Sequence, residues 1–294
     1  MTLRCACALA AAGLALGSCT IDTGRGSDAG SEVVTSTSVV VVDPPVAVGG
    51  PEPAASPPPP APAATGNSLQ SVVDSVAAAY GGSVGIAVAG PDGVRAYGDD
   101  GAYPAWSTIK VPVAVAAYRT VPQAAAALAG PAVTQSDNAA AQGMWDALPA
   151  GAADAVLAEA GVGAQVNTAV IRPEFSTFGQ TLLTASQEAT LAAQLPCLAG
   201  AGPVLELMGQ VAPDQRYGLG QFDGARFKGG WGPSPAGGYQ VRQLGLVPLP
   251  AGGNAALALT VIPASGDYAT GQAMATALAE GIRPLLGTLP ASSC

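Results

Sequence analysis

The amino-acid sequence predicts an α+β domain in which an antiparallel sheet is flanked by helices and a group of helices is inserted between the strands. Three observations lead to this prediction. The composition changes near residue 67, after which apolar residues recur with regular spacing. Strand-like runs fall in two groups, one soon after this boundary and one near the C-terminus, and alanine-rich helical stretches separate them. This order of elements is typical of an α+β domain.

The first residues have the features of an export signal. Arg4 precedes an apolar stretch over 5–16 that is too short to span a membrane, and the stretch leads into Leu16-Gly17-Ser18-Cys19. This ending resembles the lipobox of bacterial lipoproteins, which implies a signal peptide over 1–18 and a fatty-acylated Cys19. Several acyl chains would anchor the protein durably to a membrane. The alternative is an ordinary signal peptide followed by a chance cysteine.

Residues 19–67 are expected to be a disordered tether. Ser, Thr, Gly and Pro dominate this segment, which includes the run Pro57–Pro60. Such a composition buries too little apolar surface to offset the entropy lost on ordering. An isolated strand over Val39–Val42 is the alternative for one part of it. The tether would hold a folded domain away from the membrane.

Residues 68–294 are long enough for one sizeable hydrophobic core. Only 11% of the chain is charged and the formal net charge is −9. A sparse, acidic surface argues against nucleic acid as a partner and against electrostatic docking on anionic lipid. Cys197 and Cys294 remain after export, and we expect them to form a disulfide because exported proteins reach an oxidising compartment. Two unpaired thiols are the alternative.

The first elements of this domain follow from local patterns. Apolar residues at helical spacing predict a helix over 68–80. Two short apolar runs, 84–88 and 94–97, flank the turn residues 91–93 and predict a hairpin. A second helix, apolar nearly all round and therefore buried, is predicted over 107–118.

The middle of the domain is expected to be mostly helical. Alanine-rich helical stretches fill most of 122–160, and a loop is expected over 161–184. Thr184 has the character of an N-cap for a helix over 185–195, with Glu188 near its start.

Strand signals return near the C-terminus. Three runs, 225–228, 240–247 and 255–262, predict strands, and a last helix is predicted over 267–286 with Gly287 as its stop. Together with the first hairpin they complete the antiparallel sheet.

The scarcity of basic residues restricts the chemistry. The chain has no histidine and only two lysines, Lys110 and Lys228. A Ser-His-Asp triad and a histidine-ligated zinc site are therefore excluded. A nucleophilic serine in this chain would have to be activated by a lysine or a carboxylate.

Ser107 and Lys110 form the first of three motifs. At positions i and i+3 of a helix start they share one face, and the helix dipole favours an incipient alkoxide at Ser107. The simpler interpretation is an N-cap serine with a solvated lysine. The apolar run 111–117 opposes it, because a lysine at the head of a buried helix is costly unless it is paired or deprotonated.

The other two motifs are weaker by themselves. Ser136-Asp137-Asn138 is equally typical of a helix cap, and Lys228-Gly229-Gly230 of a surface lysine before a turn. Taken in this order, however, the three motifs resemble those of the penicillin-recognising serine hydrolases, which are the serine β-lactamases, most closely class A, and the D-Ala-D-Ala peptidases. The flanking stretches 103–110, 133–140 and 216–219 are also similar to class A. The resemblance covers residues 68–286, in an alanine-rich lipoprotein of actinobacterial type, and implies a β-lactamase/transpeptidase-like fold.

The resemblance implies a role for each matching residue. Ser107 would form an acyl-enzyme, Lys110 would take or relay its proton, and Ser136 would pass a proton to the leaving nitrogen. Asn138 would contact the substrate amide, and Lys228 would attract the substrate carboxylate.

Two further residues belong to the implied substrate-binding strand. Gly230 and Trp231 would line this strand, and the backbone N–H groups of Ser107 and of Trp231 or a neighbour would form an oxyanion hole.

The sequence also departs from the family pattern. Gly229 stands where the family has a hydroxyl residue, and Arg242 on the next strand is expected to compensate for it. The interval from Ser107 to Ser136 is short, so the helical lobe is expected to be trimmed. Glu174, after Arg172-Pro173, matches the position of the deacylating glutamate, although the loop that carries it is shortened; a surface ion pair with Arg172 is the alternative.

These observations give two functional hypotheses. The first is a lipid-anchored serine acyl-hydrolase on the outer face of a bacterial membrane, acting on β-lactams or D-Ala-D-Ala-type peptides, with slow deacylation if Glu174 is misplaced. The second is a non-catalytic envelope lipoprotein whose degenerate cleft binds peptidoglycan or a protein. Neither requires a cofactor or a metal.

Overall fold

The structure is a computed structural model that describes residues 68–234 and 237–292. The predicted signal peptide over 1–18, the lipidation site Cys19 and the tether over 19–67 lie outside the described residues, and so does Cys294. The disulfide between Cys197 and Cys294 therefore stays a prediction.

A five-stranded antiparallel sheet forms the centre of the domain, in the order β2-β1-β7-β6-β5. Its strands are β1 (Ser83–Gly90), β2 (Gly93–Gly98), β5 (Arg226–Ser234), β6 (Gly237–Pro248) and β7 (Asn254–Ile262). The late strands lie beside the early hairpin because β7 pairs with β1. This arrangement leaves β5 at one edge of the sheet.

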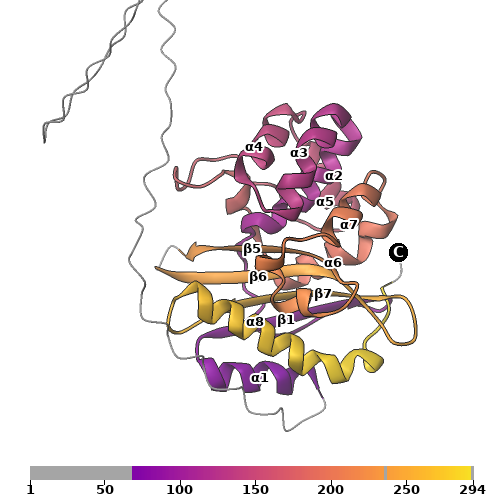
Figure 1. Cartoon of the computed structure of the whole chain (residues 1–294). Coiled ribbons are helices and arrows are strands. Elements are labelled where there is room, and N and C mark those ends of the chain that lie inside the picture. Colours follow the sequence, from indigo (N-terminus) through magenta and orange to yellow (C-terminus); the bar gives the residue numbers. More distant parts are fainter. Residues whose placement is uncertain (1–67, 235–236, 293–294) are drawn as a thin grey trace, which may run out of the picture. The chain divides into compact units, whose positions relative to one another are not determined.

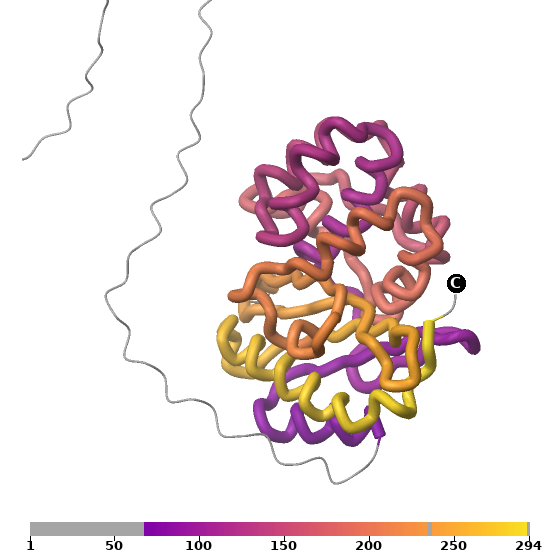
Figure 2. The backbone as a smooth tube through the Cα atoms, turned by 45° about the vertical axis from the view of Figure 1, so that its right-hand side comes forward, coloured from indigo at the N-terminus to yellow at the C-terminus, as the bar shows by residue number. Residues whose placement is uncertain are grey.

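Two helices cover one face of the sheet. They are α1 (Leu69–Tyr80), capped by the Ser68 hydroxyl, and α8 (Tyr268–Ile282), capped by the Asp267 carboxylate. The start and the end of the domain thus lie against each other, as both views show (Figures 1 and 2). Their apolar residues form one core cluster with Val84, Phe227 and Val241 of the strands.

The other face carries α6 (Ala185–Gln194) and the helical lobe (Figure 1). The lobe consists of α2 (Lys110–Thr120), α3 (Pro122–Thr134), α4 (Asn138–Ala147), α5 (Ala152–Glu159) and α7 (Gly202–Met208). Many of its buried side chains are alanines, so the helices pack closely into a second core cluster. Within the described ranges, no helix combines the length and the apolar character needed to cross a membrane.

Short elements join the sheet to the lobe. β3 (Tyr103–Pro104) pairs with β4 (Leu182–Leu183), and the 3-10 helix η1 (Trp106–Ile109) runs directly into α2. The remaining 3-10 turns are η2 (Phe178–Gln180), η3 (Leu195–Cys197), η4 (Pro213–Gln215), η5 (Gly218–Gln221) and η6 (Arg283–Thr288).

The predicted α+β class, with an antiparallel sheet flanked by helices, is confirmed. Two details differ. β5 continues through the glycines after Lys228 to Ser234, because pairing with β6 supplies ladder hydrogen bonds that local propensity does not anticipate. Thr184 caps α6 as expected, and its capping-box partner is Gln187, whereas Glu188 is fully buried.

Candidate active site

Ser107 lies on η1, at the junction between the sheet and the helical lobe. The residue before it, Trp106, has φ +51, a left-handed conformation that non-glycine residues rarely adopt. Such backbone strain persists only where the surroundings hold it in place. Ser107 is half-buried at this turn.

The edge strand β5 runs against this turn. A Cβ atom at Gly230 would lie 2.6 Å from the Ala105 carbonyl oxygen and 2.9 Å from the Ser107 nitrogen. At Gly229, which points to the other face of the strand, the nearest atom to a Cβ would be the Tyr217 hydroxyl oxygen, at 3.5 Å. Only Gly230 is therefore required by the close approach of backbone to backbone.

This contrast gives a first prediction. Gly230→Ala should lower the free energy of unfolding by about 1–3 kcal/mol, the usual cost of overpacking, because the added methyl group meets backbone atoms that cannot turn away. Gly229→Ala is the matched control and should be close to neutral. Urea denaturation of both variants measures the difference; equal midpoints would show that η1 is not tightly packed on β5.

Lys110 closes the first motif and is 2% exposed. Its ammonium group donates hydrogen bonds to the Ser136 carbonyl oxygen at 2.6 Å, to Asn138 Oδ1 at 2.8 Å and to the Asp137 carbonyl oxygen at 3.3 Å. Burial lowers the pKa of Lys110 to about 8, against the opposing charge of Asp137. Near neutral pH this lysine therefore exchanges readily between its charged and neutral forms.

Ser136 lies between the two lysines. Lys228 is fully buried and donates to Ser136 Oγ at 2.9 Å and to the Gly229 carbonyl oxygen at 2.8 Å. Burial, and secondly the charge of Lys110, hold the pKa of Lys228 well below its usual value. Ser136 itself has φ +60, a second strained position. The chain's two lysines thus converge on one serine, beside the turn that carries Ser107.

This arrangement can support acyl transfer. An uncharged Lys110 can accept a proton, Ser136 can relay one, and Lys228 in its protonated form supplies positive potential next to the relay. Asn138 is exposed, and its amide oxygen accepts a hydrogen bond from Lys110. This bond orients the side-chain amide, and within the described part of the chain the amide nitrogen keeps its capacity to donate. The structure brings together Ser107, Lys110, Ser136, Asn138, Lys228 and Gly230 from three separate segments.

Trp231 follows Gly230 on β5, on the same face of the strand as Gly229. Its ring stacks on Tyr268 with centroids 5.4 Å apart, and the Lys228 ammonium lies 5.9 Å from its centroid. The Tyr217 hydroxyl is close to Gly229, so aromatic side chains adjoin the place where the family has a hydroxyl group. The backbone role predicted for Trp231 in an oxyanion hole stays a prediction.

The structure contradicts the role expected for Arg242. This side chain is fully buried and pairs with the equally buried Glu188, with Nη2 and Oε2 2.7 Å apart. Its other hydrogen bonds go to the carbonyl oxygens of Tyr103, Pro104 and Leu183, at 2.9, 3.1 and 3.0 Å. In the strand register Arg242 pairs with Gly230, and its side chain lies beneath η1 and α6 and bonds to the β3 carbonyls. It is therefore not available to bind a substrate carboxylate.

Glu174 lies at the surface. Its carboxylate accepts a hydrogen bond from Arg172 Nε at 3.3 Å, and its side chain is 55% exposed. The loop is fixed to the site by its neighbours, since Arg172 Nη1 donates to the Pro233 carbonyl oxygen at 2.6 Å and Phe175 packs edge-on against Trp106. Glu174 therefore forms the surface ion pair with Arg172 that the sequence offered as the alternative. Its carboxylate is not among the hydrogen-bond partners of Lys110, which are oxygens of residues 136–138.

The sequence interpretation missed Glu188 and Thr108. Glu188 accepts a hydrogen bond from the Thr108 hydroxyl, next to Ser107 in the chain. A signal was present, because Glu188 shares helical spacing with Ala185, Ala189 and Ala192 and so falls on the apolar face of its helix. A carboxylate on a buried face indicates a buried partner.

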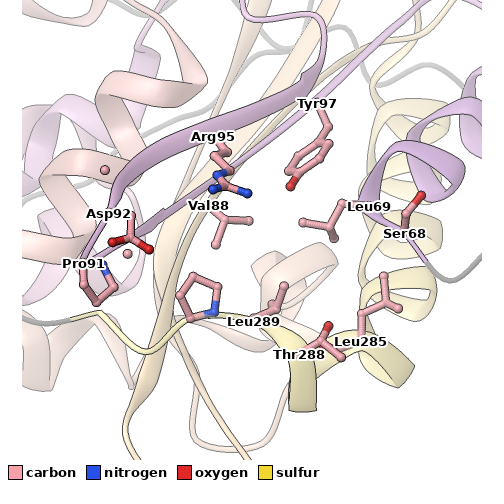
Figure 3. Close-up of a pocket in the computed structure, with 13 residues that line it drawn as sticks. Ser68, Leu69, Val88, Pro91, Asp92, Arg95, Tyr97, Leu285, Thr288 and Leu289 are labelled. Carbon is pink, nitrogen blue, oxygen red and sulfur yellow. The ribbon is translucent and has the colours of Figure 1, made fainter.

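A separate cavity of about 370 Å³ lies between the β1–β2 hairpin and η6, away from these motifs (Figure 3). Arg95, Tyr97 and Val88 line it together with Leu69 and Leu289. It includes none of the predicted site residues. Among the described residues, no group of three or more Cys, Asp or Glu side chains is placed to hold a metal ion.

Comparisons with known proteins agree with this fold. Residues 68–153 match the family model Beta-lactamase2, described as the β-lactamase enzyme family. The β-lactamase from Sphaerobacter thermophilus aligns at a TM-score of 0.59 and 19% identity, over 76% of this chain and 97% of its own. A class A β-lactamase from Bacteroides cellulosilyticus aligns at a TM-score of 0.63 and 15% identity, over 75% of this chain and 97% of its own. A β-lactamase from Chitinophaga pinensis aligns at a TM-score of 0.58 and 15% identity, over 75% of this chain and 98% of its own. No curated protein matches the sequence.

Proposed function

From the β-lactamase-like fold and the family-model match over residues 68–153, we propose that the domain is a member of the serine β-lactamase superfamily and a serine acyl-hydrolase with Ser107 as nucleophile. The observation that carries the proposal is the pair of buried lysines, Lys110 and Lys228, bonded to Ser136 beside the Ser107 turn. A site that only binds ligands gains nothing from burying two lysines close together. Burial lowers the pKa of both lysines, and the charge of Lys110 lowers the pKa of Lys228 further, at a cost in stability.

The proposed chemical step gives each of these residues a role. Lys110, when uncharged, takes the proton of Ser107 while Ser107 Oγ bonds to the carbonyl carbon of the substrate. The carbon–nitrogen bond then breaks. Ser136 passes its hydroxyl proton to the leaving nitrogen and regains one from the protonated Lys110, which becomes uncharged again. Water later attacks the ester carbon, releasing the acid and restoring the serine. The substrate class that fits is a β-lactam or a D-Ala-D-Ala-type peptide.

Deacylation is expected to be slow. Water attack on the ester needs a general base, and Glu174 is exposed and paired with Arg172. A displacement of about 1 Å can cost on the order of 10²-fold in rate. The protein would then behave as a penicillin-binding protein more than as an efficient β-lactamase, tethered by the lipid on Cys19 to the outer face of a bacterial membrane.

Covalent labelling tests the proposal. The full chain is incubated with a labelled penicillin and digested with trypsin, which cuts after Arg95 and Lys110 and yields a peptide, 96–110, whose only serine is Ser107. We expect a stable adduct on this peptide, none in Ser107→Ala, and recovery of the label with the membrane fraction of cells. A folded protein that gives no adduct with several β-lactams would refute the acyl-hydrolase. Label found only in the soluble fraction would refute the lipid anchor.

A second function is favoured by one set of observations. Gly229 lacks the family's hydroxyl, Arg242 is unavailable and Glu174 is at the surface, which suits a cleft that binds peptidoglycan or a protein without turnover. In that case Ser107→Ala leaves the function of the protein in the cell unchanged. If the protein is an acyl-hydrolase, Ser107→Ala abolishes that function.

A further inference from the structure

A buried ion pair lies directly behind the turn that carries Ser107. Glu188 of α6 and Arg242 of β6 are both fully buried, and Glu188 Oε2 lies 3.0 Å from Arg242 Nε and 2.7 Å from Nη2. Removing two charges from water is costly, and apolar residues of similar volume often fill such a place equally well. The pair therefore calls for an explanation other than stability.

Its hydrogen bonds reach the chain on both sides of Ser107. Before Ser107, the guanidinium donates to the carbonyl oxygens of Tyr103 and Pro104, and it also holds Leu183 on the paired strand β4. After Ser107, the hydroxyl of Thr108 donates to Glu188, and it lies 2.6 Å from the Ala105 carbonyl oxygen as well. The two charged groups thus contact the segments on either side of the nucleophile.

The turn between these contacts is strained and tightly packed. Trp106 has φ +51, and a Cβ atom at Gly230 would lie 3.0 Å from the Thr108 nitrogen. A strained conformation relaxes unless its surroundings over-determine it. Arg242 lies beside Gly230 on the neighbouring strand, so the ion pair supplies fixed donors and acceptors next to the place where β5 meets the turn.

We propose that Glu188 and Arg242 are positioning residues, which hold Ser107 in its reactive geometry through Thr108 and the Tyr103–Pro104 carbonyls. They do not touch the substrate. Their effect is on the orientation of the Ser107 hydroxyl, where small displacements have large effects on rate. This inference rests on the proposed acylation of Ser107.

Thr108 offers the mildest test, because it connects the pair to the nucleophile and can be changed without creating an unpaired charge. In the full chain, Thr108→Val keeps the side-chain shape and removes the hydroxyl. We expect the rate constant for acylation of Ser107 by a fluorescent penicillin to fall roughly 10- to 10²-fold, with little change in the initial binding constant. Thr108→Ser keeps the hydroxyl and should restore a rate close to that of the unchanged protein.

Thr260→Val is the matched control. The Thr260 hydroxyl is also buried but makes no hydrogen bond within the described part of the chain, so this variant should be acylated normally. If Thr108→Val is acylated as fast as Thr108→Ser, or if Thr260→Val slows acylation equally, the positioning role is refuted.

A second readout separates this inference from the proposed function. Hydrogen exchange of the segment 96–110, followed by mass spectrometry, reports the rigidity of the turn without any acylation. Faster exchange in Thr108→Val than in Thr108→Ser supports the positioning network even if penicillin never labels the protein. Equal exchange overturns it, whatever the outcome for Ser107.

Discussion

Lys110→Arg should slow the acylation of Ser107 by about 10²- to 10⁴-fold, the usual contribution of a general base. The expected cause is specific. Arginine keeps a cation for the oxygens of Ser136, Asp137 and Asn138, but it cannot lose its proton in a protein and so cannot accept one from Ser107. The measurement is the rate of adduct formation on the peptide that contains Ser107.

The pH dependence of acylation identifies the base. Because burial lowers the pKa of Lys110 to about 8, the neutral form that accepts a proton becomes abundant as the pH rises through this value. Acylation of the unchanged protein should therefore rise with pH and level off above about 8, whereas the residual rate in Lys110→Arg should not follow this titration.

The pKa can be measured directly. With only two lysines in the chain, labelling lysine with ¹³C gives two side-chain signals, and Lys110→Arg assigns them. A Lys110 signal that titrates at the ordinary lysine value would contradict the general-base role, even if Lys110→Arg proved slow.

Glu188→Met should have the largest effect on stability among the changes considered, because it leaves the buried guanidinium of Arg242 without its counter-charge. Breaking a buried pair from one side costs about 3–5 kcal/mol of unfolding free energy. Glu188 and Arg242 are both fully buried, so solvent cannot replace the missing partner. Urea denaturation measures the loss.

The double variant Glu188→Met/Arg242→Met is the control. Removing both charges together leaves no isolated ion, and the two methionines have enough flexibility to fill the space. We expect the double variant to be more stable than Glu188→Met alone, yet slow in acylation because Thr108 and the carbonyls before Ser107 lose their partners. Arg242→Met alone completes the comparison: if the cost of the double variant equals the sum of the costs of Glu188→Met and Arg242→Met, the pair is not coupled.

These residues change the interpretation of the departures from the family pattern. The sequence suggested that Arg242 compensates for Gly229 at the substrate carboxylate, but the structure directs Arg242 into the protein. Of the two basic residues expected to attract a substrate carboxylate, Lys228 remains, with Tyr217 and Trp231 nearby. We infer that substrate carboxylates are bound less tightly here than in proteins that carry the hydroxyl, which fits an acyl-enzyme function with modest turnover.

Much of the site could be predicted from local sequence. Ser107 and Lys110 are three residues apart on one turn, so their proximity is a property of helical geometry. The apolar residues after Lys110 indicate its burial, which the structure confirms. The fold class followed from the order of helical and strand patterns, since each pattern depends on neighbouring residues only.

The directions of Arg242, Glu174 and Glu188 could not be obtained in this way. Thr108 and Glu188 are 80 positions apart in the chain, and Glu188 and Arg242 are 54 apart. Their contact depends on how α6 packs on the sheet and on the register of β6. A shift of one residue in that register would turn Arg242 to the opposite face of the sheet.

The sequence by itself determined the fold class, the nucleophile candidate and the placement of both lysines in motifs, because these rest on residue type and short spacing. Only the tertiary structure decided which charged groups lie in the candidate site and which lie behind it or at the surface. It joined Lys110 and Lys228 through Ser136, left Glu174 on the surface and buried Arg242 with Glu188. The physical reason is that burial and pairing of a charge depend on segments distant in the chain, which come together only when the sheet and the helical lobe pack.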